Sequence, residues 1–465
     1  MEKFDLTVIG SGPGGYIAAI RAAQHGSRVA IVEKKDLGGL CLNLGCIPSK
    51  AILKSAELFH LMKRAGDYGL TAGDLSVDYG KVVARSRKVA GRMSKGVEFL
   101  MKKNKIVTFK GAARLTAPTR VLVERLEGDG GNVEIASDRV ILATGTEPRG
   151  VPGLSFDGRT ILHSDQAILS IDRPPAIAVI GGGAVGVEFA YWYNAFGSRV
   201  TLIEIADQLL PWTDPEIAGL LAKSFKRQGI TALTSTCVES AAPRGDGMTL
   251  TVRAGNERKT IEASTILVAV GRAACVADLG LDAAGAEIRD GFIAVDDRYR
   301  TAAPGLYAVG DVIGPPMLAH AASAEGVAAV EMMAGAGHGP VDPLRIPSCV
   351  YCQPEVASIG LTEEGAAARG IAVKVGRFPF RANGRAVGAG EEEGMVKLVG
   401  DSRYGEILGA HIIGHGATEL IAEIGLARTL EATAKEIQAT VHAHPTLAET
   451  LAEAALDIDG IALNI

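Results

Sequence analysis

The chain has little of what marks a secreted, membrane-spanning or nucleic-acid-binding protein. Only 6 of its 465 residues are cysteines, which is too few for a disulfide-stapled scaffold. It has no run of about 18 apolar residues, the length that a membrane-spanning helix needs. The formal net charge of −5 is small, so a surface for nucleic acid is not expected as its main function.

The first residues show no targeting signal. They read Met-Glu-Lys-Phe-Asp and run directly into an apolar segment, without a basic n-region or a transit segment rich in Arg and Ser. We therefore expect a soluble protein in the cytoplasm. In such a reducing compartment, a close pair of cysteines indicates a metal site or a redox-active pair.

Glycine, by contrast, is abundant. The chain has 58 glycines, close to twice the ~7% of an average protein, with no collagen-like period to account for them. The excess indicates turns and places where backbone segments approach closely. The length suggests about three domains.

Two segments of the chain repeat one pattern of strand, glycine loop, helix and strand. We expect the first over residues 6–9, 13–25 and 28–33, and the second over 177–180, 185–196 and 199–204. The loops read Gly10-Ser-Gly12-Pro-Gly14-Gly15 and Gly181-Gly-Gly183-Ala-Val-Gly186. Glu33 and Glu204 each follow the last glycine of their loop by eighteen residues. The repeat predicts two copies of one nucleotide-binding unit.

Each loop has the features that bind a dinucleotide. The first glycine makes the tight turn, the second lets the backbone approach a pyrophosphate, and the third permits close packing of helix on strand. The helix N-terminus offers amides to the phosphates, and the glutamate can accept from a ribose hydroxyl. A lone loop is weak evidence because glycine clusters occur at many turns. Since Glu204 would repel a 2′-phosphate, the second nucleotide is expected to be NAD and not NADP.

A pair of cysteines stands at the start of an expected helix. Cys41 and Cys46 flank a short loop in the segment Gly38–Lys50. A helix N-terminus favours a thiolate, which can attack a disulfide or donate charge to a neighbour. The alternatives are inert buried thiols or half of a metal site, although the spacing does not match a zinc C-x₂-C knuckle.

A histidine and a glutamate stand near the C-terminus, in the segment His442-Ala-His444-Pro-Thr-Leu-Ala-Glu449. A carboxylate can orient an imidazole as a general base and stabilise its protonated form. A lone histidine is more often structural, so the segment alone leaves both interpretations open.

With these motifs, the chain resembles the pyridine nucleotide–disulfide oxidoreductase family, and within it the dihydrolipoamide dehydrogenases, over essentially its whole length. The resemblance implies an α/β fold with two Rossmann-like nucleotide-binding domains and a C-terminal α+β dimerisation domain. The implied FAD-binding domain covers residues 1–147 and 273–345, the NAD-binding domain 148–272, and the interface domain 346–465.

The resemblance also implies a role for each reactive side chain. Cys46 would lie nearest the flavin as the charge-transfer thiol, and Cys41 would exchange with the substrate. Lys50 would lie near flavin N5, paired with Glu188. His444, oriented by Glu449, would be the acid–base catalyst and would reach into the active site of the partner subunit.

The cofactor contacts implied by the resemblance involve both loops and several single positions. For FAD they are Gly10, Gly12, Gly14, Gly15, Glu33, Lys50, Ala113, Thr144, Gly145, Asp311 and Ala319. For NAD they are Gly181, Gly183, Gly186, Glu204, Val238 and Gly271. No metal site is implied, and Cys349 and Cys352 are interpreted as incidental thiols.

The implied activity is the oxidation of protein-bound dihydrolipoamide by NAD⁺. The protein would be a homodimeric E3 component that meets the lipoyl domain and E2 core of a 2-oxoacid dehydrogenase-type complex. Ala184 stands where glutathione reductase-like enzymes have an aromatic residue, which disfavours that branch. Two alternatives stay open: a related reductase of another disulfide or of a metal ion, and a protein whose main role is docking onto a multienzyme core.

Overall fold

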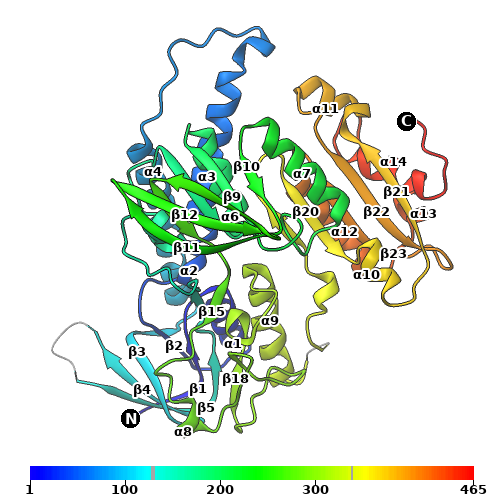
Figure 1. Cartoon of the computed structure of the whole chain (residues 1–465). Coiled ribbons are helices and arrows are strands. Elements are labelled where there is room, and N and C mark those ends of the chain that lie inside the picture. The colour runs from blue at the N-terminus through cyan, green and yellow to red at the C-terminus, as the bar shows by residue number, and fades with distance from the viewer. Residues whose placement is uncertain (127–130, 337–338) are drawn as a thin grey trace. The chain divides into compact units, whose positions relative to one another are not determined.

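The computed structural model describes residues 1–126, 131–336 and 339–465. Its helices and strands form two compact units, each built from three separated segments of chain (Figure 1). Unit 1 comprises Met1–Ile52, Gly80–Arg149 and Arg272–Val341. Unit 2 comprises Leu53–Tyr79, Gly150–Gly271 and Asp342–Ile465.

Unit 1 is built on a six-stranded sheet. The strands are β1 (Glu2–Ile9), β2 (Val29–Glu33), β3 (Val107–Ala117), β4 (Arg120–Arg125), β5 (Val133–Leu142) and β18 (Leu306–Ala308). Strand β1 pairs in parallel with β2 and β5, whose outer neighbours β3 and β18 are also parallel, while β4 is antiparallel to β3 and β5. The adjacent segments Val8–Ile9, Val29–Val32 and Val140–Leu142 of β1, β2 and β5 are apolar and buried, as strands covered on both faces require.

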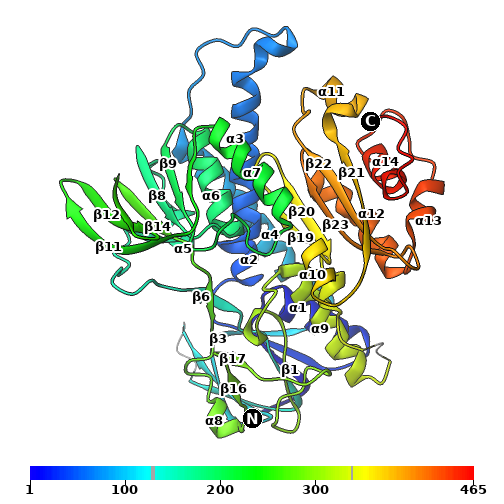
Figure 2. The same cartoon turned by 45° about the vertical axis from the view of Figure 1, so that its right-hand side comes forward.

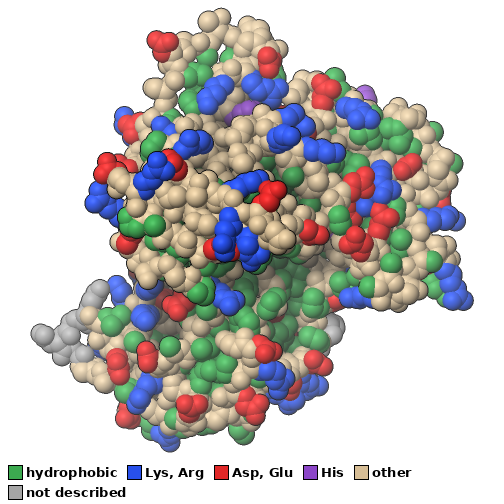
Figure 3. All heavy atoms as spheres, in the orientation of Figure 1, with side chains coloured by type: hydrophobic (Ala, Val, Ile, Leu, Met, Phe, Trp, Pro, Cys, Tyr) green, Lys and Arg blue, Asp and Glu red, His purple; other side chains and the backbone are tan. Residues whose placement is uncertain are grey.

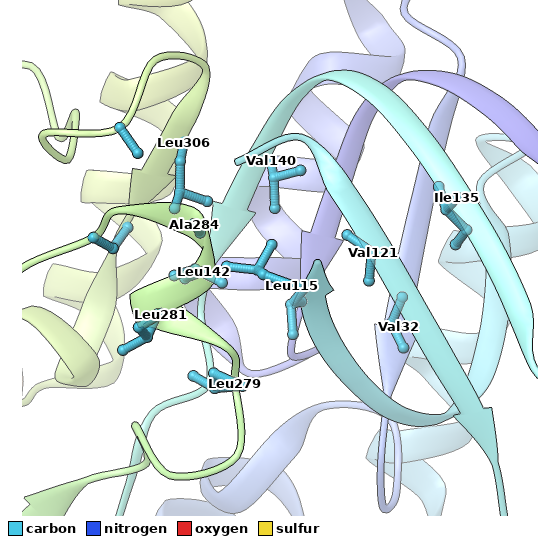
Figure 4. Close-up of a cluster of buried hydrophobic side chains, with 14 of the residues drawn as sticks. Val32, Leu115, Val121, Ile135, Val140, Leu142, Leu279, Leu281, Ala284 and Leu306 are labelled. Atoms are coloured by element: carbon cyan, nitrogen blue, oxygen red, sulfur yellow. The ribbon is translucent and has the colours of Figure 1, made fainter. Parts of the chain in front are cut away.

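The core of unit 1 joins this sheet to a distant part of the chain. Figure 4 shows Val140 and Leu142 of β5 close to Leu306 of β18 and to Leu281 of the short helix α8 (Leu281–Ala284). Helices α1 (Pro13–Gln24), α4 (Tyr79–Lys103) and α9 (Ala319–Met333) complete the nucleotide-binding unit. A Cβ on Gly326 of α9 would lie 2.5 Å from the carbonyl oxygen of Gly14 on α1, so the two helices pack through small residues.

Unit 2 contains a second, five-stranded parallel sheet in the order β10-β9-β8-β14-β7. Its strands are β7 (Ile161–His163), β8 (Ala176–Ile180), β9 (Arg199–Ile203), β10 (Thr231–Leu233) and β14 (Thr265–Val268). Its helices are α5 (Ser164–Ala167), α6 (Ala184–Ala195) and α7 (Pro215–Arg227). A separate antiparallel sheet is formed by β11 (Thr236–Arg244), β12 (Gly247–Ala254) and β13 (Glu257–Ala263).

The C-terminal part of unit 2 is a five-stranded antiparallel sheet in the order β19-β20-β23-β22-β21, with helices beside it (Figure 2). The strands are β19 (Ser348–Val350), β20 (Val356–Gly360), β21 (Val373–Pro379), β22 (Met395–Asp401) and β23 (Ile407–Ile413). The helices are α10 (Glu363–Ala367), α11 (Gly384–Ala389), α12 (Ala417–Thr429), α13 (Ala434–Ala439) and α14 (Glu449–Ile458). A Cβ on Gly376 would lie 1.9 Å from Ala454 O, so glycine lets α14 approach β21.

The remaining elements are one longer helix, α3 (Cys46–Lys63), and several short helices, turns and strand pairs. The short ones are α2 (Gly39–Asn43), the strand pairs β6 (Thr146–Pro148) with β15 (Arg272–Ala274) and β16 (Ile288–Arg289) with β17 (Phe292–Ile293), and the 3₁₀ turns η1 (Ala65–Tyr68), η2 (Gly310–Ile313), η3 (Pro343–Arg345) and η4 (Phe380–Ala382). Of these, α2 and the beginning of α3 carry the cysteine pair.

A group of charges around two buried side chains, Lys397 and Asp214, lies where α7 meets the C-terminal sheet of unit 2. We call Lys397, Asp214, Glu216, Glu363 and Arg377 the Lys397 cluster. The ammonium of Lys397, 4% exposed, lies 2.8 Å from Asp214, 3.1 Å from Glu216 and 2.6 Å from Glu363. Arg377 pairs with both glutamates. Burial lowers the pKa of Lys397, but the hydrogen bonds to Asp214 and Glu363 outweigh it and raise the pKa above its usual value.

The predicted fold class is confirmed: two parallel nucleotide-binding sheets and a C-terminal α+β domain. The predicted division of the chain at residues 147, 272 and 345 stays a prediction. On the face seen in Figure 3, basic and acidic side chains are interspersed. Every helix within the described residues is too short or too polar to cross a bilayer.

Candidate functional site

The first glycine loop lies in unit 1, between β1 and α1. Gly10 has φ +99°, and a Cβ there would lie 2.3 Å from Ala143 O. A Cβ on Gly15 would lie 2.0 Å from Gly10 O, so only glycine lets the helix pack this close to the strand. A Cβ on Gly12 would meet no atom within 4 Å, so this side of the loop is open. In the described part of unit 1, no side chain caps the first turn of α1, and its amides face this opening.

Glu33 stands beside this loop at the end of β2. Its Oε2 accepts from the amide of Ser11 at 2.8 Å and from the Ser11 hydroxyl at 2.6 Å, and its Oε1 accepts from Lys35 N at 2.7 Å. A carboxylate held at the mouth of a loop with uncapped amides suits the ribose and pyrophosphate of a dinucleotide. The residues present therefore fit FAD.

Other positions expected to contact FAD also lie in unit 1. Asp311 is in η2, and its Oδ2 accepts from the Thr146 hydroxyl at 3.2 Å. Burial raises the pKa of Asp311. Thr144 donates to Cys275 O at 2.8 Å, and Gly145 follows with φ +69°. The last two positions are Ala319, which begins α9, and Ala113, which pairs with Val123.

The cysteine pair lies in unit 1 beside the first glycine loop. Cys41 is in α2, and Cys46 is the first residue of α3. A Cβ on Gly39 would lie 2.6 Å from Gly12 Cα, and Gly38 N donates to the Ser11 hydroxyl at 3.2 Å. These contacts bring the start of α2 directly against the loop.

The surroundings of Cys41 strengthen the hold of its sulfur on a proton. The structure shows both as thiols. The hydrogen bond to Cys46, burial and the charge of Cys46 raise the pKa of Cys41, whereas the charge of Lys50 lowers it. In the reduced pair, Cys41 therefore holds its proton more tightly than an ordinary thiol does.

The second glycine loop, in unit 2, repeats the first. Gly181 has φ +110°, and a Cβ there would lie 2.3 Å from Ala269 O. A Cβ on Gly186 would lie 1.8 Å from Gly181 O. Glu204 is 8% exposed and accepts from Gly182 N at 2.5 Å and from Ala206 N at 2.7 Å. Like the first loop, it fits a dinucleotide.

Three further predicted positions lie in unit 2. Val238 is in β11, and Gly271, with φ +115°, follows β14. Glu188 is on α6, 5% exposed, and its Oε1 accepts from Tyr351 N at 3.1 Å. Because Lys50 belongs to unit 1, its pairing with Glu188 stays a prediction.

The C-terminal histidine and glutamate are in hydrogen-bond contact. His444 Nδ1 lies 2.8 Å from Glu449 Oε1, and Glu449 Oε2 accepts from Thr446 N at 2.8 Å. Burial raises the pKa of Glu449, but these hydrogen bonds outweigh it and leave the pKa below its usual value. The His444 side chain is 79% exposed, so its ring is presented outward. The geometry is that of an imidazole oriented by a carboxylate.

The structure also describes the remaining candidates. Cys349 lies in β19, and Cys352 is fully buried, with its thiol donating to Pro354 O at 3.2 Å. Across residues 1–126, 131–336 and 339–465, no group of three or more His, Cys, Asp or Glu side chains is arranged to hold a metal ion. One feature that the sequence did not single out is Trp212, which lies against Gly183 of the second loop.

The chain matches two family models. Residues 4–326 match pyridine nucleotide-disulphide oxidoreductase, and residues 346–455 match the dimerisation domain of the pyridine nucleotide-disulphide oxidoreductases. A dihydrolipoyl dehydrogenase of Chlorobaculum parvum is 48% identical, over 97% of this chain and 96% of the relative. One of Bacillus subtilis is 42% identical, over 99% of both chains.

Solved structures give the same result. LpdA from Mycobacterium tuberculosis superposes with a TM-score of 0.91 at 28% identity, covering 98% of this chain and all of that one. The copper(II) complex of the HOCl-induced flavoprotein disulfide reductase RclA from Escherichia coli has a TM-score of 0.86 at 25% identity, covering 98% of this chain and 99% of that one.

Proposed function

We propose that this chain, which belongs to the pyridine nucleotide–disulphide oxidoreductase family, oxidises dihydrolipoyl groups and reduces NAD⁺. It uses FAD and NAD, as its family does. The observation that carries the proposal is the contact of the cysteine segment with the first glycine loop, where a Cβ on Gly39 would lie 2.6 Å from Gly12 Cα. A dithiol carrier is thereby built into the wall of a dinucleotide site.

In the proposed reaction, His444 takes a proton from one thiol of the substrate. The resulting thiolate attacks Cys41 in the Cys41–Cys46 disulfide, and Cys46 leaves as a thiolate. The second substrate thiol then attacks the substrate sulfur of the mixed disulfide, which releases the oxidised lipoyl group. Cys41 leaves and takes the first proton from His444, and His444 then accepts the proton of the second substrate thiol. The raised pKa of Cys41 favours this distribution. Bound FAD supplies the two-electron carrier between the dithiol and NAD⁺.

Lys50 and Glu449 support this chemistry electrostatically. The positive charge of Lys50 acts on the cysteine pair and favours the thiolate form. Glu449 fixes the ring of His444 and stabilises its protonated state. We further propose that Lys50 pairs with Glu188 near the flavin, and that the FAD and NAD contacts are those expected from the sequence.

The protein forms a homodimer through its dimerisation domain. We propose that His444 and Glu449 complete the active site of the partner subunit. Dihydrolipoyl groups would arrive on the lipoyl domain of an E2 core in a 2-oxoacid dehydrogenase-type complex. A location in the cytoplasm stays a prediction.

An anaerobic titration tests the proposal. The purified flavoprotein is reduced stepwise with dihydrolipoamide, its visible spectrum is recorded, and NAD⁺ is then added. We expect a long-wavelength band from the Cys46 thiolate beside the flavin, and its loss on addition of NAD⁺. Reduction by NADH but not by dihydrolipoamide would contradict the substrate assignment and favour another disulfide or a metal ion.

A His444→Gln variant tests the assignment of the base. We expect turnover with dihydrolipoamide to fall by about 10²- to 10⁴-fold, the usual contribution of a general base. Reduction of an artificial electron acceptor by NADH requires no substrate thiol and serves as the control. Equal loss of both activities would contradict the assigned role.

A further inference from the structure

The chain has 2 tryptophans, and they differ in environment. Trp192 lies in α6 and is fully buried, while Trp212 is 47% exposed. Single exposed apolar side chains are common on protein surfaces, so the exposure of Trp212 supports an inference only through what surrounds its ring.

Trp212 belongs to the segment 205–213 between β9 and α7, which runs along the second glycine loop. Leu210 N donates to Gly182 O at 2.9 Å. A Cβ on Gly182 would lie 3.0 Å from the Leu209 side chain, and a Cβ on Gly183 would lie 3.5 Å from the Trp212 ring. The segment thus forms a wall beside the loop from Glu204 to the start of α6.

Hydrogen bonds hold both the indole ring and its chain segment in place. Its Nε1 donates to the hydroxyl of Ser348 in β19 at 3.2 Å. Asp214, two residues after Trp212, caps the N-terminus of α7. It belongs to the Lys397 cluster, and its side chain is 1% exposed. Gln208 donates to Thr213 O at 2.9 Å, which closes the segment on itself. The ring is therefore ordered before any ligand binds.

We infer that Trp212 is an NAD-binding residue whose indole ring lines the path of the adenosine–pyrophosphate half of the cofactor. This inference rests on the proposed placement of NAD at the second glycine loop. With the adenosine ribose at Glu204 and the pyrophosphate at Gly183, the indole ring lies beside the path between them. An apolar ring there excludes water, which strengthens the hydrogen bonds between the loop amides and the phosphates.

Tryptophan fluorescence of the flavin-loaded dimer tests the contact directly. The probe is ADP-ribose, which has the adenosine and pyrophosphate of NAD but no nicotinamide, so no electron transfer follows its binding. We expect ADP-ribose to change the emission of the wild-type protein. The change disappears in Trp212→Phe, in which only the buried Trp192 emits.

Affinity gives a second, independent measurement. In Trp212→Ala we expect the dissociation constant of ADP-ribose, measured by calorimetry, and the KM for NAD⁺ to rise by about tenfold. The kcat at saturating NAD⁺ stays within about twofold, because the ring touches the half of the cofactor that does not react. Ser348→Ala, which frees the ring, has a smaller effect. Tyr404→Ala removes another exposed aromatic side chain, 69% exposed, and is the matched control with unchanged affinity.

The outcomes separate the inference from the proposed function. ADP-ribose that binds without a Trp212-dependent change in emission, and equally well to Trp212→Ala, overturns the inference and leaves the NAD site in place. ADP-ribose that binds Gly186→Ala as tightly as it binds the wild type overturns both, because the dinucleotide then does not use the second glycine loop. An emission change that depends on protein concentration and not on ADP-ribose assigns Trp212 to a protein contact and overturns the inference.

Discussion

The two glycine loops have nearly the same backbone but differ in what covers them. In both, the first glycine has positive φ, at +99° for Gly10 and +110° for Gly181. In both, a Cβ on the last glycine would clash with the first glycine's carbonyl oxygen, at 2.0 Å for Gly15 and 1.8 Å for Gly186. In both, the acidic residue accepts from the second amide of the loop. The shared motif fixes the geometry that binds phosphates.

The segments that follow make the difference. The first loop has Ser11, whose hydroxyl donates to Glu33 and accepts from Gly38 N, and thereby joins the loop to the cysteine segment. The second loop has Gly182 at this position, and its neighbour is the wall that ends in the exposed Trp212. The first loop thus adjoins the cysteine segment, and the second adjoins the segment that ends at Trp212. This difference suits the proposed roles, in which the first loop holds the flavin beside the cysteines and the second binds the dinucleotide that exchanges in each cycle.

The strongest test of this comparison places the same methyl group in both loops. Gly15→Ala and Gly186→Ala each put a Cβ against a carbonyl oxygen, at 2.0 Å and 1.8 Å in the unrelaxed structure. We expect Gly15→Ala to purify with less than about a tenth of the flavin, and Gly186→Ala to keep its flavin but show a KM for NAD⁺ raised by more than about 100-fold. Flavin absorbance per chain and steady-state kinetics measure both effects. Loss of flavin in Gly186→Ala would show that the two sites are not independent.

Next in size is the effect of removing the negative charge from each loop. In Glu204→Gln, the repulsion of a 2′-phosphate is lost, so we expect the preference for NAD⁺ over NADP⁺ in kcat/KM to narrow by about tenfold. Glu33→Gln is the matched control at the other loop and is expected to leave this ratio unchanged. An altered ratio in Glu33→Gln would mean that the exchangeable nucleotide uses the first loop.

Replacing the second residue of each loop with alanine is expected to have a smaller effect. Ser11→Ala removes a hydroxyl with two hydrogen bonds, at 2.6 Å to Glu33 and 3.2 Å from Gly38 N, and is expected to lower the free energy of unfolding by about 1 kcal/mol. Gly182→Ala places a Cβ 2.9 Å from the Glu204 Cβ and is expected to cost about 1 kcal/mol through crowding. Denaturant titration of each variant measures both. An unchanged midpoint for Ser11→Ala would argue against the connection to the cysteine segment.

The smallest expected effect concerns the cysteine pair itself. The charge of Lys50 favours negative charge on the reduced cysteine pair, so Lys50→Met is expected to reduce the fraction of pairs that carry a thiolate at neutral pH. We expect alkylation of the reduced protein by iodoacetamide to slow by about threefold near neutral pH, with the pH profile moved to higher pH. Lys54→Met, which removes a lysine paired with Glu57 on the same helix, is the control. Faster alkylation in Lys50→Met would reverse the assigned sign.

The features predicted from the sequence are the local ones. The first helix was expected over residues 13–25 and is observed over Pro13–Gln24, because its start is set by adjacent glycines and Pro13. The contact of His444 with Glu449 was also predictable, since the two residues are only five positions apart in the sequence. Such features depend on a short stretch of chain and on backbone rules that apply in any protein.

The features missed depend on distant contacts or on weak patterns. Trp212 acquires its meaning from Gly183 and from Ser348, which is 136 residues further along the chain. Strand β13 carries exposed charged residues at Glu257–Lys259, so its apolar alternation is too weak to predict a strand. The pairing of Lys50 with Glu188 stays a prediction, because the two residues are far apart in the sequence and belong to different units.

The Lys397 cluster restricts how this sequence can vary. Its three carboxylates and two cations converge where α7 packs against the C-terminal sheet, and Lys397 and Asp214 are almost wholly buried. Loss of one partner leaves an uncompensated charge in the interior, which is far more costly than replacement of the whole set by apolar residues. Among related sequences, we therefore expect positions 214, 363 and 397 to be conserved together or substituted together.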